Sequence, residues 1–223
     1  DPAKGLSFNS EGELNMQMGI NDFSAKEAIN NLSATELEKI FKFFGDENEA
    51  KKIANQIVEK RKEKEINTQG LVDLIEKTKR KKNFKIHSAT KVFQALRIFV
   101  NKEVTELING IIGATKKLKP GGKILVISFH SIEDRIVKYF FSNFSKNKSR
   151  PSRYFPENKA LEKSLFNEYK NRVIRPSKKE IELNNRARSA KLRFAVRSNN
   201  KFEYPKDLIK KFKRFLDLEA INV

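Results

Sequence analysis

The residues best suited to chemistry come at the end of a predicted strand, residues 123–129, whose unbroken apolar middle is typical of burial on both faces in a parallel sheet. Phe129, His130 and Ser131 lie there, directly before a helix-like pattern. In open parallel sheets, ligands bind beyond the carboxyl ends of strands and next to helix N-termini. Phe129 offers a stacking face, His130 a ring that is neutral near pH 7, and the Ser131 region backbone donors. Alternatively, Phe129 packs and His130 only caps the helix.

A second candidate site is the basic stretch of residues 184–193. It holds four cations within eight residues, Arg186, Arg188, Lys191 and Arg193, together with short polar side chains such as Ser189. Arginine binds phosphate through two parallel hydrogen bonds and lysine acts as a point charge, so the stretch could bind nucleic acid. An alternative is a charged strand edge that discourages aggregation.

A third set of polar residues lies on one face of a long helix that we expect from about Thr90 to Leu118. The residues recur at helical spacing and are Lys91, Gln94, Arg97 and Asn101. They either line a cleft or form the solvated side of the helix, and their spacing does not decide between the two.

Helices are also expected ahead of these sites. Ser24 with Glu27, and Ser33 with Glu36, have the Ser-x-x-Glu spacing of capping boxes, which predicts two helix starts. Apolar residues recur every three or four positions after the second start and again in residues 53–58 and 71–75, which extends the second helix and predicts two more. The chain up to about residue 95 therefore reads as a small all-helical module.

The remainder of the chain reads as an α/β unit with a helical tail. Ser131 and Asp134 are expected to cap a helix after the strand, and Ser177 a short helix before Asn184. From Ala190 onward apolar and basic residues alternate, which predicts a half-exposed strand. Its expected apolar face carries Ala190, Leu192, Phe194 and Val196, and its expected solvent face Lys191, Arg193 and Arg197. The last two dozen residues form a basic amphipathic pattern that either docks on the protein or contacts RNA.

Composition points to a polyanionic partner. The 223 residues include 47 Lys plus Arg against 28 Asp plus Glu, a net charge of +19. Residues 1–75 hold 10 basic and 14 acidic side chains, whereas residues 76–223 hold 37 and 14, so the excess lies in the second part. Nucleic acid is the leading expectation for such a chain.

Several classes of site are disfavoured. The chain has no Cys, which removes thiolate metal sites and sulfur redox chemistry, and its two His, His87 and His130, lack a metal-binding spacing, so we expect no metal. No apolar stretch approaches the roughly 20 residues that span a bilayer. We therefore expect a cytoplasmic protein without membrane contact.

Five runs closely resemble the bacterial RsmH (MraW) family and follow its order. They are Gly5–Phe8, His87–Ile98, Lys119–Gly122, Ile127–Lys138 and Arg186–Arg193, of which the SFHS-x-EDR-x-VK block is the most specific. Members of this family are S-adenosylmethionine-dependent enzymes that methylate the exocyclic N4 of a cytosine in the decoding region of small-subunit (16S) ribosomal RNA.

The resemblance implies an α/β fold, the C-terminal and hence incomplete part of a Rossmann-like class I methyltransferase domain with an all-helical inserted domain. The implied parts are the end of the N-terminal methyltransferase segment (1–12), the helical insertion (13–95), the C-terminal methyltransferase part (96–198) and a basic tail (199–223). The family's glycine-rich cofactor loop has no counterpart here, so the main S-adenosylmethionine residues are expected upstream of Asp1 and those within this chain are unknown.

The resemblance also implies roles for residues. Phe129, His130 and Ser131 become candidate catalytic residues, and the candidate RNA-binding residues are Arg97, Asn101, Arg186, Arg188, Ser189, Lys191 and Arg193. The partner would be 16S ribosomal RNA or the small ribosomal subunit, and a dimer is possible. Residues 14–19, Leu-Asn-Met-Gln-Met-Gly, lack charges that the family carries there, which puts a role for them in doubt. The alternatives are a non-catalytic RNA-binding protein or fragment without the cofactor site, and a methyltransferase for DNA or another RNA base.

Overall fold

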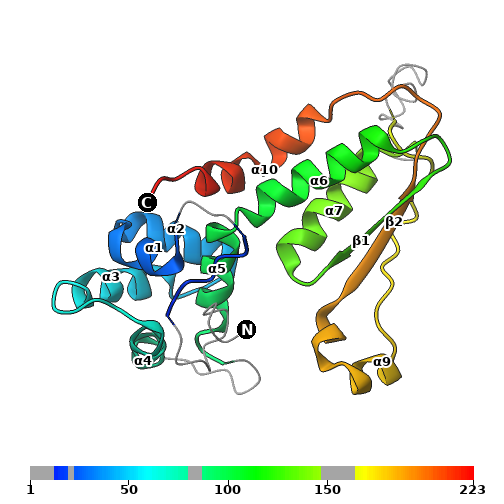
Figure 1. The fold of residues 1–223 in the computed structure, drawn as a ribbon. Helices are drawn as coiled ribbons and strands as arrows, with labels where there is room; N and C mark the ends of the chain where they lie inside the picture. The colour runs from blue at the N-terminus through cyan, green and yellow to red at the C-terminus, as the bar shows by residue number, and fades with distance from the viewer. Residues whose placement is uncertain (1–12, 20–22, 80–86, 147–163) are drawn as a thin grey trace. The chain divides into compact units, whose positions relative to one another are not determined.

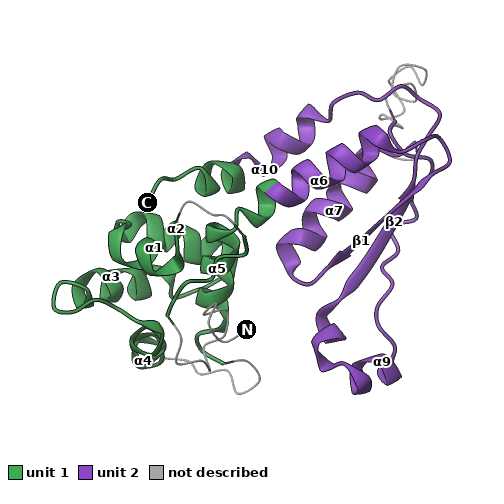
Figure 2. Cartoon of the chain, viewed as in Figure 1, with its two compact units in different colours: residues 1–105, 214–223 green, residues 106–213 purple. Residues whose placement is uncertain are grey.

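The computed structural model describes residues 13–19, 23–79, 87–146 and 164–223. The chain forms two compact units, residues 1–105 with 214–223, and residues 106–213 (Figure 2). This division falls ten residues later than the expected boundary at 95 and joins the end of the chain to the first unit. The expected segment 1–12 and the motif Gly5–Phe8 lie outside the described residues.

The first unit begins with four helices, as predicted (Figure 1). They are α1 (Ala25–Asn31), α2 (Ala34–Gly45), α3 (Ala50–Lys60) and α4 (Thr68–Thr78). Both predicted capping boxes are confirmed: the Ser24 and Ser33 hydroxyls accept from the amides of Glu27 and Glu36, whose carboxylates accept hydrogen bonds in return. These helix starts are fixed by local hydrogen bonds, which explains why the sequence predicts them.

The single long helix expected from Thr90 to Leu118 is wrong, because two helices occupy this range. They are α5 (Thr90–Val100) and α6 (Glu103–Lys117). Asn101 ends α5 and Lys102 has a positive φ of 48°. The Glu219 carboxylate accepts from the amides of Val104 and Thr105, both at 2.8 Å, and from the Thr105 hydroxyl at 2.6 Å. A residue more than 100 positions away therefore satisfies the start of α6, which a local pattern cannot reveal.

Helices α2 and α5 approach each other closely at Gly45. A Cβ atom on Gly45 would lie 2.5 Å from the backbone oxygen of Lys91 and 3.3 Å from Cβ of Ala95. The side chains of Lys91 and Gln94 bind the backbone oxygens of Asp46 and Phe44, at 2.7 and 3.2 Å. Glycine at the end of α2 thus permits α5 to bind the carboxyl end of that helix.

The second unit contains an antiparallel pair of strands, β1 (Lys123–Ser128) and β2 (Lys191–Val196). Leu125 lies opposite Phe194, and Ser128 opposite Lys191. The expectation of a parallel strand buried on both faces is wrong for the described residues. Helix α7 (Ser131–Asn143) contacts both strands, and Ile124 is buried, but Leu125 and Ile127 on the other face are each 60% exposed.

The predicted faces of β2 are reversed. Arg193 and Ala195 are buried, whereas Phe194 is exposed. The alternation was correctly predicted, but its direction depends on a partner far away in sequence, the carboxylate of Asp134 on α7. A buried arginine with a carboxylate partner is compatible with the covered face, which an argument from hydropathy alone misses.

Two short helices precede β2, and a longer one ends the chain. They are α9 (Lys178–Leu183), whose N-cap is Ser177 as predicted, the 3₁₀-helix η2 (Asn185–Ser189), and α10 (Lys206–Glu219). The apolar side of α10 is docked: Phe212 packs edge-on against Tyr139 within the second unit, and Phe215 lies 5.8 Å from Phe44 within the first. Of the two alternatives for the tail, docking is therefore observed. Among the described residues, none of the helices has the length and apolar character needed to span a membrane.

Candidate active-site turn and RNA-binding residues

The turn between β1 and α7 carries the three candidate catalytic residues. His130, and not Ser131 as expected, is the N-cap of α7: its Nδ1 accepts from the Glu133 amide at 3.4 Å. The Glu133 carboxylate accepts in return from the amides of Phe129 at 2.7 Å and His130 at 3.2 Å. The alternative in which His130 caps the helix is therefore observed, and these two amides are already occupied by a protein carboxylate.

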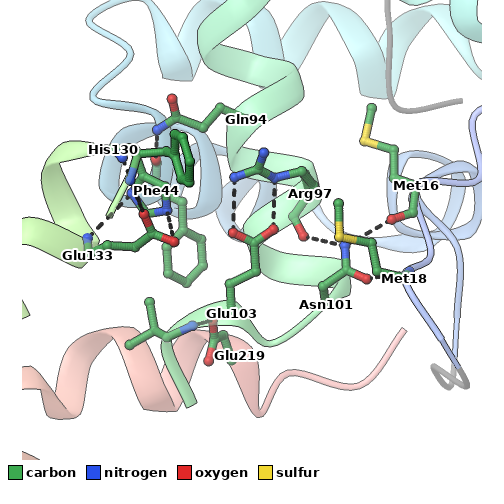
Figure 3. A network of polar contacts seen from close by, with 12 residues as sticks. Met16, Met18, Phe44, Gln94, Arg97, Asn101, Glu103, His130, Glu133 and Glu219 are labelled. Carbon is green, nitrogen blue, oxygen red and sulfur yellow. Dashed lines mark hydrogen bonds and ion pairs between the residues drawn. The ribbon is translucent and has the colours of Figure 1, made fainter. Parts of the chain in front are cut away.

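The same hydrogen bonds define the state of His130. Because Nδ1 accepts a hydrogen bond, the neutral ring carries its hydrogen on Nε2, which lies 3.3 Å from Oε1 of Glu133. Burial on its own would raise the pKa of Glu133, but the side chain and positive charge of His130, together with hydrogen bonds from the Phe129 and His130 amides, hold that pKa below its ordinary value. Figure 3 shows the two side chains facing each other. The turn thus presents a histidine beside an ionised carboxylate.

Phe129 is an exposed member of the turn. The residue is 55% exposed, so the alternative in which it packs in the core is wrong for the described part of the chain. Ser131, the first residue of α7, is exposed as well. An exposed aromatic ring next to a polar helix start can stack on a planar ligand such as a nucleobase.

Arg193 on β2 binds the first turn of α7, directly after the candidate catalytic residues. Its Nε and Nη2 donate to the two carboxylate oxygens of Asp134, at 2.7 and 3.2 Å, and its Nη1 donates to Tyr169 and Asn171. The Asp134 amide in turn donates to the His130 carbonyl at 3.2 Å. Burial would raise the pKa of Asp134, but Arg193 and Lys191 together hold it below its ordinary value. Arg193 is only 6% exposed and connects β2 to α7 through Asp134, so the described structure gives it a role within the protein, and its contact with RNA phosphates stays a prediction.

The other predicted cations of this stretch are accessible. Arg186, Arg188 and Ser189 lie exposed on η2, and Lys191 is half-buried with its Nζ 3.3 Å from Asp134. Arg188 donates to the backbone oxygen of Asn185 at 3.1 Å. Arg186, Arg188 and Ser189 are therefore the exposed members of the predicted set, while Lys191, Arg97 and Asn101 are partly covered.

Arg97 and Asn101, in the first unit, are engaged by the protein itself. The Arg97 guanidinium donates to both carboxylate oxygens of Glu103, at 2.8 and 3.1 Å. The Asn101 amide donates to the Met16 carbonyl at 2.9 Å and its oxygen accepts from the Met18 amide at 2.7 Å (Figure 3). The two alternatives for this helix face were a cleft lining and a solvated surface. Arg97 and Asn101 fit neither, because they hold residues 14–19 and the end of α5 in place.

Sequence reasoning missed Glu133, and it expected Asp134 to cap the helix and not to bind Arg193. Glu133 and Asp134 stand three and four positions after His130, and the spacing His-x-x-Glu is that of a capping box with an unusual first residue. That spacing could have identified Glu133. Nothing in the sequence indicated Tyr169 or Asn171, which reach Arg193 from a separate segment.

Comparisons with known proteins agree with the resemblance. The model described as "MraW methylase family" matches residues 1–198. Ribosomal RNA small subunit methyltransferase H of Rhizobium etli is 43% identical over 204 residues, which cover 89% of this chain and 58% of the relative. The proteins of the same name from Agrobacterium fabrum and Bartonella quintana are 43% and 44% identical, over 87% of this chain and 57% and 59% of their own lengths. The chain thus spans less than two thirds of the curated relatives it matches. The match is consistent with an α/β class I fold, here rich in helix with a small two-stranded sheet.

Proposed function

Because the chain belongs to the MraW methylase family, we propose that the protein uses S-adenosylmethionine to methylate the exocyclic N4 of a cytosine in the decoding region of 16S ribosomal RNA in the cytoplasm. The observation that carries the proposal is the position of the block Ile127–Lys138, which supplies the end of β1 and an exposed, polar helix start. We also propose that β1, α7 and β2 form the C-terminal part of a Rossmann-like domain, with α1–α4 in a helical insertion.

Among the described residues we recognise no binding site for S-adenosylmethionine. The Phe129 and His130 amides at the end of β1 already bind Glu133, and the sequence contains no glycine-rich motif of the kind that binds a cofactor. We therefore assign no residue of this chain to S-adenosylmethionine and consider only how the chain handles the RNA base, in a mechanism that uses no metal.

The target amine is a weak nucleophile because its lone pair is delocalised into the cytosine ring, so the base must be unstacked and held by its edge. Phe129 supplies the stacking face, and Ser131 a hydroxyl beside it. The amine must lose a proton, and we assign its uptake to Nδ1 of His130, which would have to exchange its bond with the Glu133 amide, at 3.4 Å the longest of the three in the cap, for a bond with the amine. The resulting imidazolium would be stabilised by the Glu133 carboxylate, 3.3 Å from Nε2.

The test is methyl transfer by the protein expressed from its natural gene, with 16S ribosomal RNA as substrate and mass spectrometry to identify N4-methylcytidine. His130→Ala is expected to lower kcat by about 100-fold or more, the usual scale of general acid–base catalysis, with RNA affinity unchanged. His87→Ala is the matched control, because that histidine pairs with Glu76 in the first unit. Full turnover by His130→Ala would remove its catalytic role, and a methyl group on another base would overturn the target.

A non-catalytic RNA-binding protein is the second candidate, favoured by the exposed Arg186 and Arg188 beside a turn to which no cofactor residue is assigned. Calorimetry with S-adenosylmethionine separates the two. Micromolar binding supports the enzyme, and RNA binding without any S-adenosylmethionine binding supports the second candidate.

A further inference from the structure

We propose that residues 172–189, called here the basic α9–η2 segment, form a docking surface for the RNA backbone beside the candidate active-site turn. The inference rests on the proposed function because it takes RNA as the partner. It extends the accessible cations of η2 to a larger surface that neither the motifs nor the family match identified.

Charge is the first observation. The segment contains six cations and two acidic residues, Glu180 and Glu182. All six cations are exposed, and they are Arg172, Arg175, Lys178, Lys179, Arg186 and Arg188. Within the described residues, no carboxylate forms an ion pair with any of them. Such a concentration of uncompensated charge attracts a polyanion.

Neighbouring arginines have a different environment. Arg193 is buried against Asp134, and Arg197 is buried with hydrogen bonds to the carbonyl oxygens of Leu165, Ser198 and Asn200. The arginines of this region therefore divide into buried ones that satisfy acceptors in other segments and exposed ones whose charge is not paired with a carboxylate within the described residues. The exposed group is the one suited to phosphate.

Position is the second observation. The segment leads directly into β2, whose first residue, Lys191, lies opposite Ser128, the last residue of β1. Its other end is held by Ile174, which bridges Leu192 with hydrogen bonds in both directions at 2.9 Å. Figure 1 shows α9 beyond the end of the strand pair at which β1 finishes and β2 begins. RNA bound along the segment would thus lie at the strand end that carries Phe129 and His130.

Leu183 adds an apolar contact. It is 82% exposed at the end of α9, among the cations. A leucine there can cover a ribose or the face of a base, whereas α9, with six residues and none buried, is too short to offer the apolar face of a membrane-binding helix. The surface therefore fits RNA better than a lipid bilayer.

The experiment measures RNA affinity against salt, by fluorescence anisotropy of a labelled single-stranded RNA with the decoding-region sequence, using the protein expressed from its natural gene. One variant removes four charges of the segment, Arg172→Gln, Arg175→Gln, Lys178→Gln and Lys179→Gln. The control removes four exposed lysines of the first unit, Lys39→Gln, Lys51→Gln, Lys64→Gln and Lys77→Gln. Both lose the same net charge.

For single strands, each phosphate contact contributes about 0.7 to the slope of log affinity against log salt. The segment variant is therefore expected to lower the slope by up to about 3, with at least a tenfold loss of affinity at 0.1 M salt, and the control to change it little. Leu183→Ser is expected to weaken binding with an unchanged slope. Equal slopes for the two four-charge variants would overturn the proposal. It would also be overturned if the segment variant lost binding to phosphatidylserine vesicles while its RNA binding stayed intact.

Methyl transfer distinguishes failure of this inference from failure of the proposed function. If the natural protein transfers no methyl group but the segment variant shows the lower slope, the docking surface stands and the proposed enzyme does not. If the protein methylates the RNA and the two slopes agree, the enzyme stands and the docking surface does not.

Discussion

Replacing Asp134 with Asn is expected to loosen the turn that carries Phe129 and His130. Asp134 accepts two hydrogen bonds from the buried Arg193 guanidinium and one from Lys191 at 3.3 Å. A hydrogen bond to a charged group contributes about 1.5–3 kcal/mol and a neutral one about 1 kcal/mol. Because Asn keeps one acceptor oxygen but leaves Arg193 without a buried countercharge, we expect a loss of about 2–3 kcal/mol of unfolding free energy at pH 7.

The pH dependence identifies the charge as the cause. The folded protein holds the pKa of Asp134 below its ordinary value of 3.8, so its contribution is present above that value and is lost as the pH falls through the folded pKa. Urea denaturation followed by circular dichroism should therefore show a gap between wild type and Asp134→Asn at pH 7 that closes in acid. Glu182→Gln, an exposed carboxylate on α9, is the control and should change stability by less than about 0.5 kcal/mol.

Two outcomes would refute this reasoning. Equal stability of Asp134→Asn and Glu182→Gln at pH 7 would mean that the Arg193 pair stabilises nothing. A gap of unchanged size at pH 2 would mean that packing, and not charge, is lost. In RNA binding, Asp134→Asn should leave the salt slope unchanged while lowering kcat for methyl transfer, since the residue positions the turn and does not meet phosphate.

Two further predictions concern the helices α2, α6 and α10. Gly45→Ala should destabilise the protein by about 2 kcal/mol, because its Cβ would lie 2.5 Å from the Lys91 backbone oxygen. Gly113→Ala on α6 should stabilise the protein by about 0.5–1 kcal/mol, because nothing lies within 4 Å of the added Cβ and alanine favours a helix. Thermal unfolding of both variants checks this, and shifts of the same sign would contradict it. Burial, with the nearby charge of Glu103, raises the pKa of Glu219 from 4.5 to about 7, so its contribution is full below pH 4.5 and declines as the pH rises through 7. The midpoint of thermal unfolding of the wild type should therefore fall relative to that of Glu219→Gln between pH 5 and 8, and a relative rise would contradict the direction.

Local signals in the sequence predicted the elements that local hydrogen bonds create. The capping boxes at Ser24 and Ser33 each join residues three apart, so their spacing alone indicates them. The break between α5 and α6 was missed because its partners are remote: Met16 binds Asn101 from 85 positions away, and Glu219 binds Val104 from 115. No helical period contains that information.

The candidate site also contains features that local sequence patterns predict and features that depend on remote partners. Phe129, His130 and Ser131 are candidates because they follow a strand and precede a helix, and this local pattern is confirmed. Which arginines face solvent was not predictable, because Arg186 and Arg193 have the same side chain and differ only in whether a carboxylate from another element reaches them. Charge in a sequence indicates a polyanion in general, and only the fold decides which cations are available.

The register of β1 and β2 connects the two parts of the candidate site. Side chains alternate between the faces of a strand, so a slip of one residue would place Phe194 beneath α7 and turn Arg193 outward. The bidentate bond from Arg193 to Asp134 opposes that slip, since it can form only when Arg193 faces α7. The same register sets Lys191 opposite Ser128, and therefore places the start of β2, with the basic α9–η2 segment before it, at the strand end that carries Phe129. One buried ion pair thus fixes both the orientation of the turn and the place where RNA would approach it.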